Sequence, residues 1–168
     1  VACALFDLDR QFPADASELR IRDVAQAANL LRERRQDLFA VMQEVGQAYL
    51  GRFGAEHQAL LKRVQDALAL SFVRMATRHG SWGNDLHEYH NEQHALELLN
   101  GRLARVRLQL GWAALEAQDW LLLALFATCH DLRQREAADF WHDIGANERA
   151  SIAETFRLLD HVGFSRQA

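Results

Sequence analysis

The chain has 168 residues, of which 49% are apolar and 25% are charged, and its formal net charge is −4 at pH 7. This length and balance predict a single globular, water-soluble domain with a sizeable core. The acidic charge argues against non-specific binding to nucleic acid, because such binding requires a basic surface.

The first stretch of the chain is apolar and closes at Pro13, so we expect residues 1–16 to form an N-terminal arm. Asp15 and Glu18 have the spacing of an N-terminal capping pair, and a helical region is expected to begin there. We expect the helices of residues 17–80 either to join the main bundle or to form a dimerisation hairpin, which would make the protein a homodimer.

Apolar side chains recur in this region every three to four residues, which is the spacing of a helix with one buried face. The first stripe predicts one long helix, or two helices that separate near Arg34, with a stop at residues 51–54. The second stripe predicts a helix over about residues 55–78, followed by a loop. His79 falls at the end of this helix and is expected to be solvated.

Residues 81–168 are expected to form the core that carries the functional site. The apolar pattern and the glycine positions predict helices over residues 89–110, 118–131 and 147–162, with a loop over residues 132–146. The last helix is expected to be capped by Asn147 and to turn Ile152 inward. Strand patterns are absent, so the expected fold class is all-α.

The most apolar run of the chain covers residues 120–129. It includes Leu122, Leu123 and Phe126, which we expect to be buried. The run is too short to span a bilayer, and no signal peptide is evident, so we expect no membrane association. Cys3 and Cys129 are far apart in the sequence and need not pair, which favours a reducing, cytoplasmic location.

Two short motifs carry the residues suited to chemistry. The segment YHNEQHA at residues 89–95 contains His90 and His94, whose imidazoles would share one face of a helix. They can act as two metal ligands, or as one ligand and one proton donor. His130 and Asp131 follow the apolar run, at the expected mouth of the core, where partial desolvation strengthens metal binding.

Two imidazole nitrogens and one carboxylate form a mixed nitrogen and oxygen set of donors. Such a set suits manganese, iron, cobalt, nickel or zinc better than calcium, and magnesium is a further candidate. The sequence therefore predicts a site for a divalent transition metal.

The motif YHNEQHA, followed by an apolar helix that ends in His-Asp, resembles the HD superfamily of metal-dependent phosphohydrolases. Cyclic nucleotide phosphodiesterases and a group of small bacterial HD phosphohydrolases share the Tyr-His-Asn-x-x-His form. The segment NERAS at residues 147–151 is similar to an Asn-Glu-x-x-Ser segment of the bacterial group. The resemblance spans about residues 86–163 and implies an HD-domain-like helical bundle.

The resemblance implies that His94, His130 and Asp131 hold the metal. It implies hydrolysis of a small phosphoester, such as a nucleotide, by water that the metal activates. His90 would protonate the leaving oxygen, and Glu148 is a further candidate catalytic residue.

The same resemblance suggests supporting roles for neighbouring residues. Tyr89 and Asn91 would support the start of the helix, and His142 and Asp143 would contact the substrate from the loop. A carboxylate or carbonyl partner would have to keep His90 protonated, and Glu92, Glu148 and Asp143 are the candidates.

Two features leave alternatives open. His142 and Asp143 form a second His-Asp pair, but a short polar stretch precedes it, so we favour His130 and Asp131 as ligands. The superfamily also uses a further aspartate well beyond its His-Asp pair, and Asp160 lies too close behind to match easily. Residues 81–168 are therefore expected to be an incomplete core. A degenerate HD domain that senses a nucleotide or binds a protein without turnover is the alternative function.

Overall fold

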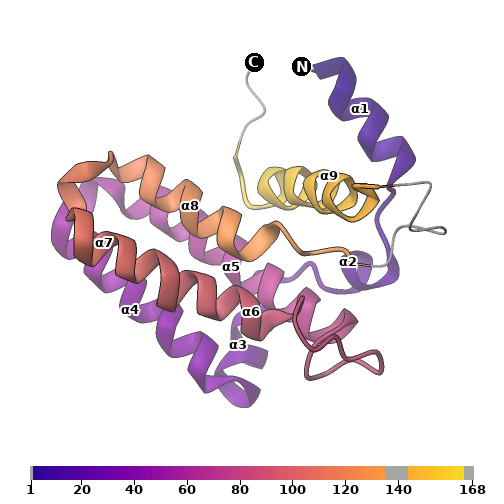
Figure 1. Ribbon diagram of the computed structural model, residues 1–168, viewed down its shortest axis with the longest axis horizontal. Coiled ribbons are helices and arrows are strands. Elements are labelled where there is room, and N and C mark those ends of the chain that lie inside the picture. The colour runs from indigo at the N-terminus through magenta and orange to yellow at the C-terminus, as the bar shows by residue number, and fades with distance from the viewer. Residues whose placement is uncertain (1, 135–143, 165–168) are drawn as a thin grey trace.

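The computed structural model describes residues 2–134 and 144–164, and the side chains among them from residue 7 onward. These residues form helices and no strand, so the expected all-α bundle is confirmed (Figure 1). Within these described ranges, no helix has both the length and the apolarity needed to cross a membrane.

The first half of the chain is a series of helices separated by short breaks. They are α1 (Ala2–Gln11), α2 (Ala16–Arg20), α3 (Val24–Arg34), α4 (Gln36–Phe53) and, after a single 3-10 turn (Ala55–His57), α5 (Gln58–Arg78). Asp15 caps α2 as expected, because its carboxylate accepts a hydrogen bond from the Glu18 N–H. The first long stripe divides into two helices at Arg35, and the expected stop is confirmed at Gly54, whose φ of 93° suits glycine.

The second half begins with a long helix of three consecutive parts. They are α6 (Glu92–Leu96), a π-helical stretch (Glu97–Leu103) and α7 (Ala104–Leu110). After a 3-10 turn (Trp112–Ala114) come α8 (Ala117–Cys129) and α9 (Ala146–His161). The long helix begins three residues later than expected, because Asn91 caps it from outside.

Helix α5 is the centre of the apolar core. It contacts α3, α4, α6 and α8 (Figure 1), and its residues Leu68, Phe72 and Met75 are almost completely buried. One apolar cluster therefore joins the expected region 17–80 to the expected region 81–168. The boundaries between these regions stay a prediction.

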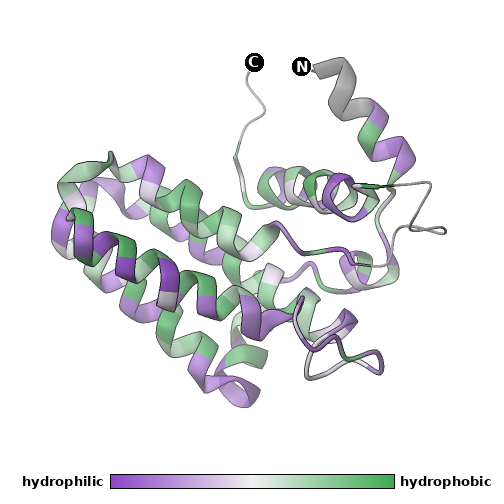
Figure 2. Cartoon of the chain, in the orientation of Figure 1, coloured by the Kyte–Doolittle hydropathy of each residue, from purple (hydrophilic) through white to green (hydrophobic). Residues whose placement is uncertain are grey.

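Apolar residues lie on all sides of helix α8 after its first turn, and most of the side visible in Figure 2 is apolar, but only one side of the helix is buried. Leu121 is 3% exposed, whereas Leu122, Leu123 and Phe126 are 58%, 38% and 65% exposed. The expectation that these three side chains are buried is therefore wrong. Helices α5 and α6 cover one side of α8, and a cavity separates its other side from α9.

Helix α9 begins one residue earlier than expected. Gly145, with a φ of 83°, occupies the cap position, so the prediction that Asn147 caps this helix is wrong. The prediction that Ile152 turns inward is also wrong, because this side chain is 45% exposed. Helix α9 instead shares a small apolar cluster with the chain just after α1, made of Phe12, Ala146, Ala150 and Ala153.

A buried ionic network joins α5 to α9. The carboxylate of Glu154 is fully buried and accepts hydrogen bonds from Arg74 at 3.1 Å and from Arg78 at 2.7 Å. Arg78 also donates to the carboxylate of Asp15, at 2.6 and 2.8 Å. Removing one partner would leave a buried charge uncompensated, which is strongly destabilising. The intact network therefore holds α9 against α5.

Candidate metal centre

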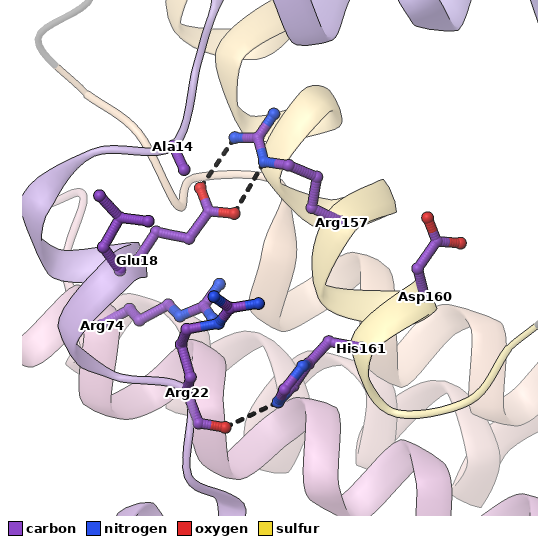
Figure 3. Close-up of a pocket in the computed structure, with 8 residues that line it drawn as sticks. Ala14, Glu18, Arg22, Arg74, Arg157, Asp160 and His161 are labelled. Carbon is purple, nitrogen blue, oxygen red and sulfur yellow. Dashed lines mark hydrogen bonds and ion pairs between the residues drawn. The ribbon is translucent and has the colours of Figure 1, made fainter.

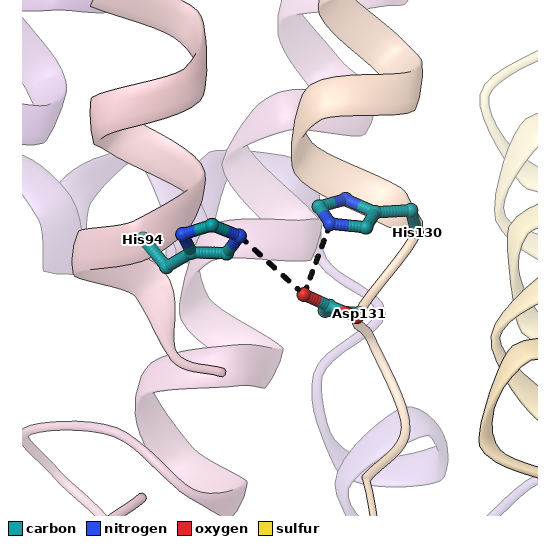
Figure 4. Close-up of side chains that lie close together, drawn as sticks. All are labelled: His94, His130 and Asp131. Carbon is teal, nitrogen blue, oxygen red and sulfur yellow. Dashed lines mark ion pairs between the residues drawn. The ribbon is translucent and has the colours of Figure 1, made fainter. Parts of the chain in front are cut away.

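Three metal-ligating side chains meet where α6 begins and α8 ends. His94 lies on α6, and His130 and Asp131 follow the last turn of α8. The Nε2 atoms of His94 and His130 lie 3.7 and 3.0 Å from the Oδ2 atom of Asp131 (Figure 4). The three ligand atoms all lie within 4.8 Å of one another, so this group can hold a metal ion.

The start of α6 fixes the position of His94. The Asn91 side chain accepts hydrogen bonds from the backbone N–H groups of Gln93 and His94, at 2.9 and 3.2 Å. Its amide also donates to the His87 carbonyl at 2.6 Å. The ring of Tyr89 packs against the His94 ring, with 4.2 Å between centroids. These contacts orient an imidazole that is almost fully buried.

The contacts of His130 are compatible with a tautomer suited to metal binding. Its Nδ1 atom lies 3.1 Å from the Phe126 carbonyl oxygen, which can only accept a hydrogen bond. Donation by Nδ1–H leaves the lone pair on Nε2, the atom that faces Asp131. The hydrogen bond to Asp131 raises the pKa of His130 above its usual value, despite its partial burial, so a proton on Nε2 has to leave before a metal binds there.

Asp131 supplies the one carboxylate of the group. Burial opposes its ionisation, but hydrogen bonds from His130 and His90 outweigh that effect and lower its pKa to about 2. Its second oxygen, Oδ1, accepts a hydrogen bond from Gln134 at 2.9 Å. Burial also lowers the pKa of His94, which keeps that imidazole neutral. A charged carboxylate and neutral imidazoles are the forms that bind metals, so this group can hold a metal ion once His130 loses its proton.

His90 does not lie on the helix that carries His94. It precedes the cap residue Asn91, so the expectation that both histidines share one helical face is wrong. The two rings still face the same centre, with 6.0 Å between centroids. The Nδ1 atom of His90 lies 2.9 Å from Asp131 Oδ2, and its side chain is 47% exposed.

Among the described residues, Asp131 therefore supplies the carboxylate that contacts His90. Glu92, one of the expected partners, is instead buried and accepts hydrogen bonds from Arg35 and from the Ser81 N–H. Glu148, a second candidate, is exposed in the first turn of α9 and lines the same cavity as His130.

His142 and Asp143 lie outside the described residues. Their expected contact with substrate, and the choice between the two His-Asp pairs, therefore stay predictions. The described pair, His130 with Asp131, is the one that meets His94.

The loop that follows Asp131 is held by residues whose role the sequence did not reveal. Arg78 donates a hydrogen bond to the Leu132 carbonyl at 2.8 Å. The Ser151 hydroxyl accepts from the Arg133 N–H at 3.0 Å and lies 3.3 Å from the Arg133 carbonyl. Ser151 belongs to the NERAS segment, so that motif contained a signal. Nothing near Arg78 in the sequence indicates its contact, because 54 residues separate it from Leu132.

His79 differs from its expected environment. It was expected to be solvated at a helix end, but it is 4% exposed and packs against the ring of His87 at 5.2 Å. Burial lowers its pKa to about 4, so it is neutral at pH 7. The loop after α5 covers His79, and the position of His79 at a helix end did not indicate this burial.

Asp160 lies in a different cavity, of about 420 Å³, lined by α2, α5 and α9 (Figure 3). In that cavity, Arg157 donates two hydrogen bonds to Glu18, at 2.7 and 2.8 Å. His161 lies 2.7 Å from the Arg22 carbonyl oxygen. Among the described residues, Asp160 does not belong to the group that can hold a metal.

No family model, no curated protein and no solved structure matches this chain.

Proposed function

We propose that this chain is a metal-dependent phosphohydrolase of the HD type, which hydrolyses a nucleotide or another small phosphoester. The observation that carries the proposal is the convergence of His94, His130 and His90 on one oxygen of Asp131. These four residues are also the ones that the resemblance assigns to metal binding and catalysis.

The proposed metal ligands are His94, His130 and Asp131. A divalent cation bound there would lower the pKa of a water molecule and offset negative charge on the phosphoryl oxygens. The residues of the chain orient and desolvate this position. Asn91 fixes the start of α6, and donation from His130 Nδ1 to the Phe126 carbonyl would leave Nε2 free to bind a metal.

His90 is proposed as the proton donor. Its Nδ1–H is used in the hydrogen bond to Asp131, which leaves Nε2–H as the group that would donate to the substrate. The water oxygen forms a bond to phosphorus as the bond from phosphorus to the ester oxygen breaks. The ester oxygen takes the proton from His90 Nε2. In this proposal Glu148 accepts the proton that the water gives up.

A nucleotide-sensing or protein-interaction module without turnover is the second candidate. The observation that favours it is the size of the ligand group, because the described residues supply three donors. Asp160, the one later aspartate among them, lies in another cavity. A site with three protein ligands still leaves positions open for water, so it is compatible with catalysis.

A phosphoester panel separates the two functions. The purified chain is loaded with manganese, and release of phosphate or alcohol is followed for monoesters, diesters and nucleotides. Turnover that disappears with a chelator and returns with manganese supports the enzyme. Stoichiometric metal without turnover of any ester favours the module.

A further inference from the structure

An apolar cavity of about 480 Å³ lies between α8 and α9 and reaches the candidate metal centre. His130, Asp131 and Glu148 line it at one end. The rest of its wall is mainly apolar and includes Leu122, Leu125, Phe126, Ile152, Phe156 and Leu159. This size and composition are typical of a small-molecule site with a few polar groups at one end.

The apolar wall is open to solvent and continuous with the metal ligands. Phe126, Leu122 and Ile152 are large apolar side chains that remain exposed, and grouped exposure of this kind marks a binding surface. The Phe126 ring stacks on the His130 ring, with 5.2 Å between centroids and an interplanar angle of 22°. Ile152 lies one helical turn after Glu148, so both face the same cavity.

The described residues of the wall offer little to recognise a polar group. Thr155 is one of its polar residues, and its hydroxyl already donates to the Ser151 carbonyl at 2.7 Å. Cys129 is another, but burial raises the pKa of its thiol to about 11, so it is neutral. A sugar or a nucleobase placed here would leave its polar groups without partners among these side chains, which disfavours binding.

We infer that this cavity binds the apolar alcohol part of the substrate, so that the preferred phosphoesters are aryl or alkyl esters. The inference rests on the proposed function for the phosphate position. The phosphate lies at His130 and Asp131, and the apolar group extends between α8 and α9 along Ile152 and Leu122.

Binding of non-hydrolysable phosphonates tests this inference without turnover. Calorimetry compares 2-naphthylmethyl phosphonate with methyl phosphonate on the manganese-loaded full chain. The naphthyl compound should bind more tightly, and Leu122→Gln and Ile152→Gln should each reduce that preference by about tenfold. Both side chains are partly exposed, so glutamine is tolerated there. Leu108→Gln is the matched control, because Leu108 is exposed on α7 outside the cavity.

Three results would overturn the inference. They are equal affinity for the two phosphonates, unchanged preference in both cavity variants, or an equal loss in Leu108→Gln. A change in oligomeric state would also overturn it. If Leu122→Gln converts a dimer to monomers and keeps the naphthyl preference, the surface binds a second copy of the chain instead. A failure of the proposed function alone would give another result: the chain would still prefer the naphthyl phosphonate but would not hydrolyse 2-naphthyl phosphate.

Discussion

The Nδ1 atom of His90 lies 2.9 Å from Asp131 Oδ2, the same oxygen that lies 3.0 Å from His130 Nε2. One carboxylate oxygen therefore contacts both a proposed metal ligand and the proposed proton donor. A cation bound by His94, His130 and Asp131 would lie close to His90, even if His90 is not one of its ligands. The proposed roles of His90 and His94 are compatible with this arrangement, and the variants below distinguish them.

The first prediction concerns His90→Ala. The metal should stay, because His94, His130 and Asp131 are intact, but turnover of esters with poor leaving groups should fall by roughly 10²–10⁴-fold, the usual share of general acid catalysis. A nitrophenyl ester needs little protonation of its leaving oxygen, so the variant should cleave it almost as fast as the parent. Steady-state kinetics on the two esters, with metal analysis, provide the measurement.

Tyr89→Phe is the control for this variant, since it keeps the ring that packs on His94 and leaves His90 unchanged. It should retain both metal and turnover. Loss of metal from His90→Ala, with the nitrophenyl ester uncut, would show that His90 is a ligand and not a donor.

The second prediction concerns the cap of α6. Asn91→Ala removes the acceptor for two backbone N–H groups, so the free energy of unfolding should fall by about 0.5–2 kcal/mol. Because the cap also orients His94, the affinity for metal should fall by roughly tenfold or more. Asp23→Ala removes the cap of α3, which lies outside the metal group, and is the matched control. A similar loss of metal affinity in both variants would contradict the role of Asn91.

The third prediction separates the two sides of α8. Leu121→Ala should lower the free energy of unfolding by about 2–5 kcal/mol, because this side chain is buried in the core. Leu122→Ala removes the same atoms from the exposed side and should change it by about 0.5 kcal/mol or less. Urea denaturation gives both values. Equal losses would mean that the side of α8 facing the cavity is packed in solution.

The fourth prediction concerns acid stability. Burial opposes ionisation of Asp15, but Arg78 and the Glu18 N–H outweigh it and lower the pKa of Asp15 from 3.8 to about 2. A carboxyl group with a lowered folded pKa stabilises the protein above its unfolded pKa, and this stabilisation is lost as the pH falls through the folded value. Asp15→Asn should therefore be less stable than the parent at pH 7, and the difference should shrink between about pH 4 and pH 2.

Asparagine at position 15 can still cap α2, so the comparison isolates the charge. Asp23 caps α3 and has no arginine partner among the described residues, so Asp23→Asn serves as the control. A difference between Asp15→Asn and the parent that stays constant down to pH 2 would contradict the ion pair.

Much of the fold was predictable because each helix carries its own local signal. The stripe over residues 55–78 and the capping pair of Asp15 and Glu18 are confirmed by α5 and α2. Helix α8 shows where such signals fail: its composition indicates burial, but only its neighbours decide which side is covered. Leu121 and Leu122 are adjacent leucines with opposite environments.

The convergence of the candidate ligands was predictable from the two motifs, but its geometry was not. Asn91 is a strong capping residue, and that signal could have moved the predicted helix start from Tyr89 to Glu92. The contact of His90 with Asp131 joins residues 41 positions apart, and the ionic network joins Arg74 to Glu154 across 80 positions. Contacts of that range depend on packing, which a sequence pattern does not encode locally.

The metal content of single variants shows whether His94, His130 and Asp131 hold a metal. The full chain and its His94→Ala, His130→Ala, His90→Ala and His142→Ala variants are purified from metal-replete growth and analysed for bound transition metals. We expect stoichiometric metal in the parent, in His90→Ala and in His142→Ala, and its loss from His94→Ala and His130→Ala. A parent without metal, or a site that His142→Ala empties and His130→Ala leaves filled, would contradict this expectation.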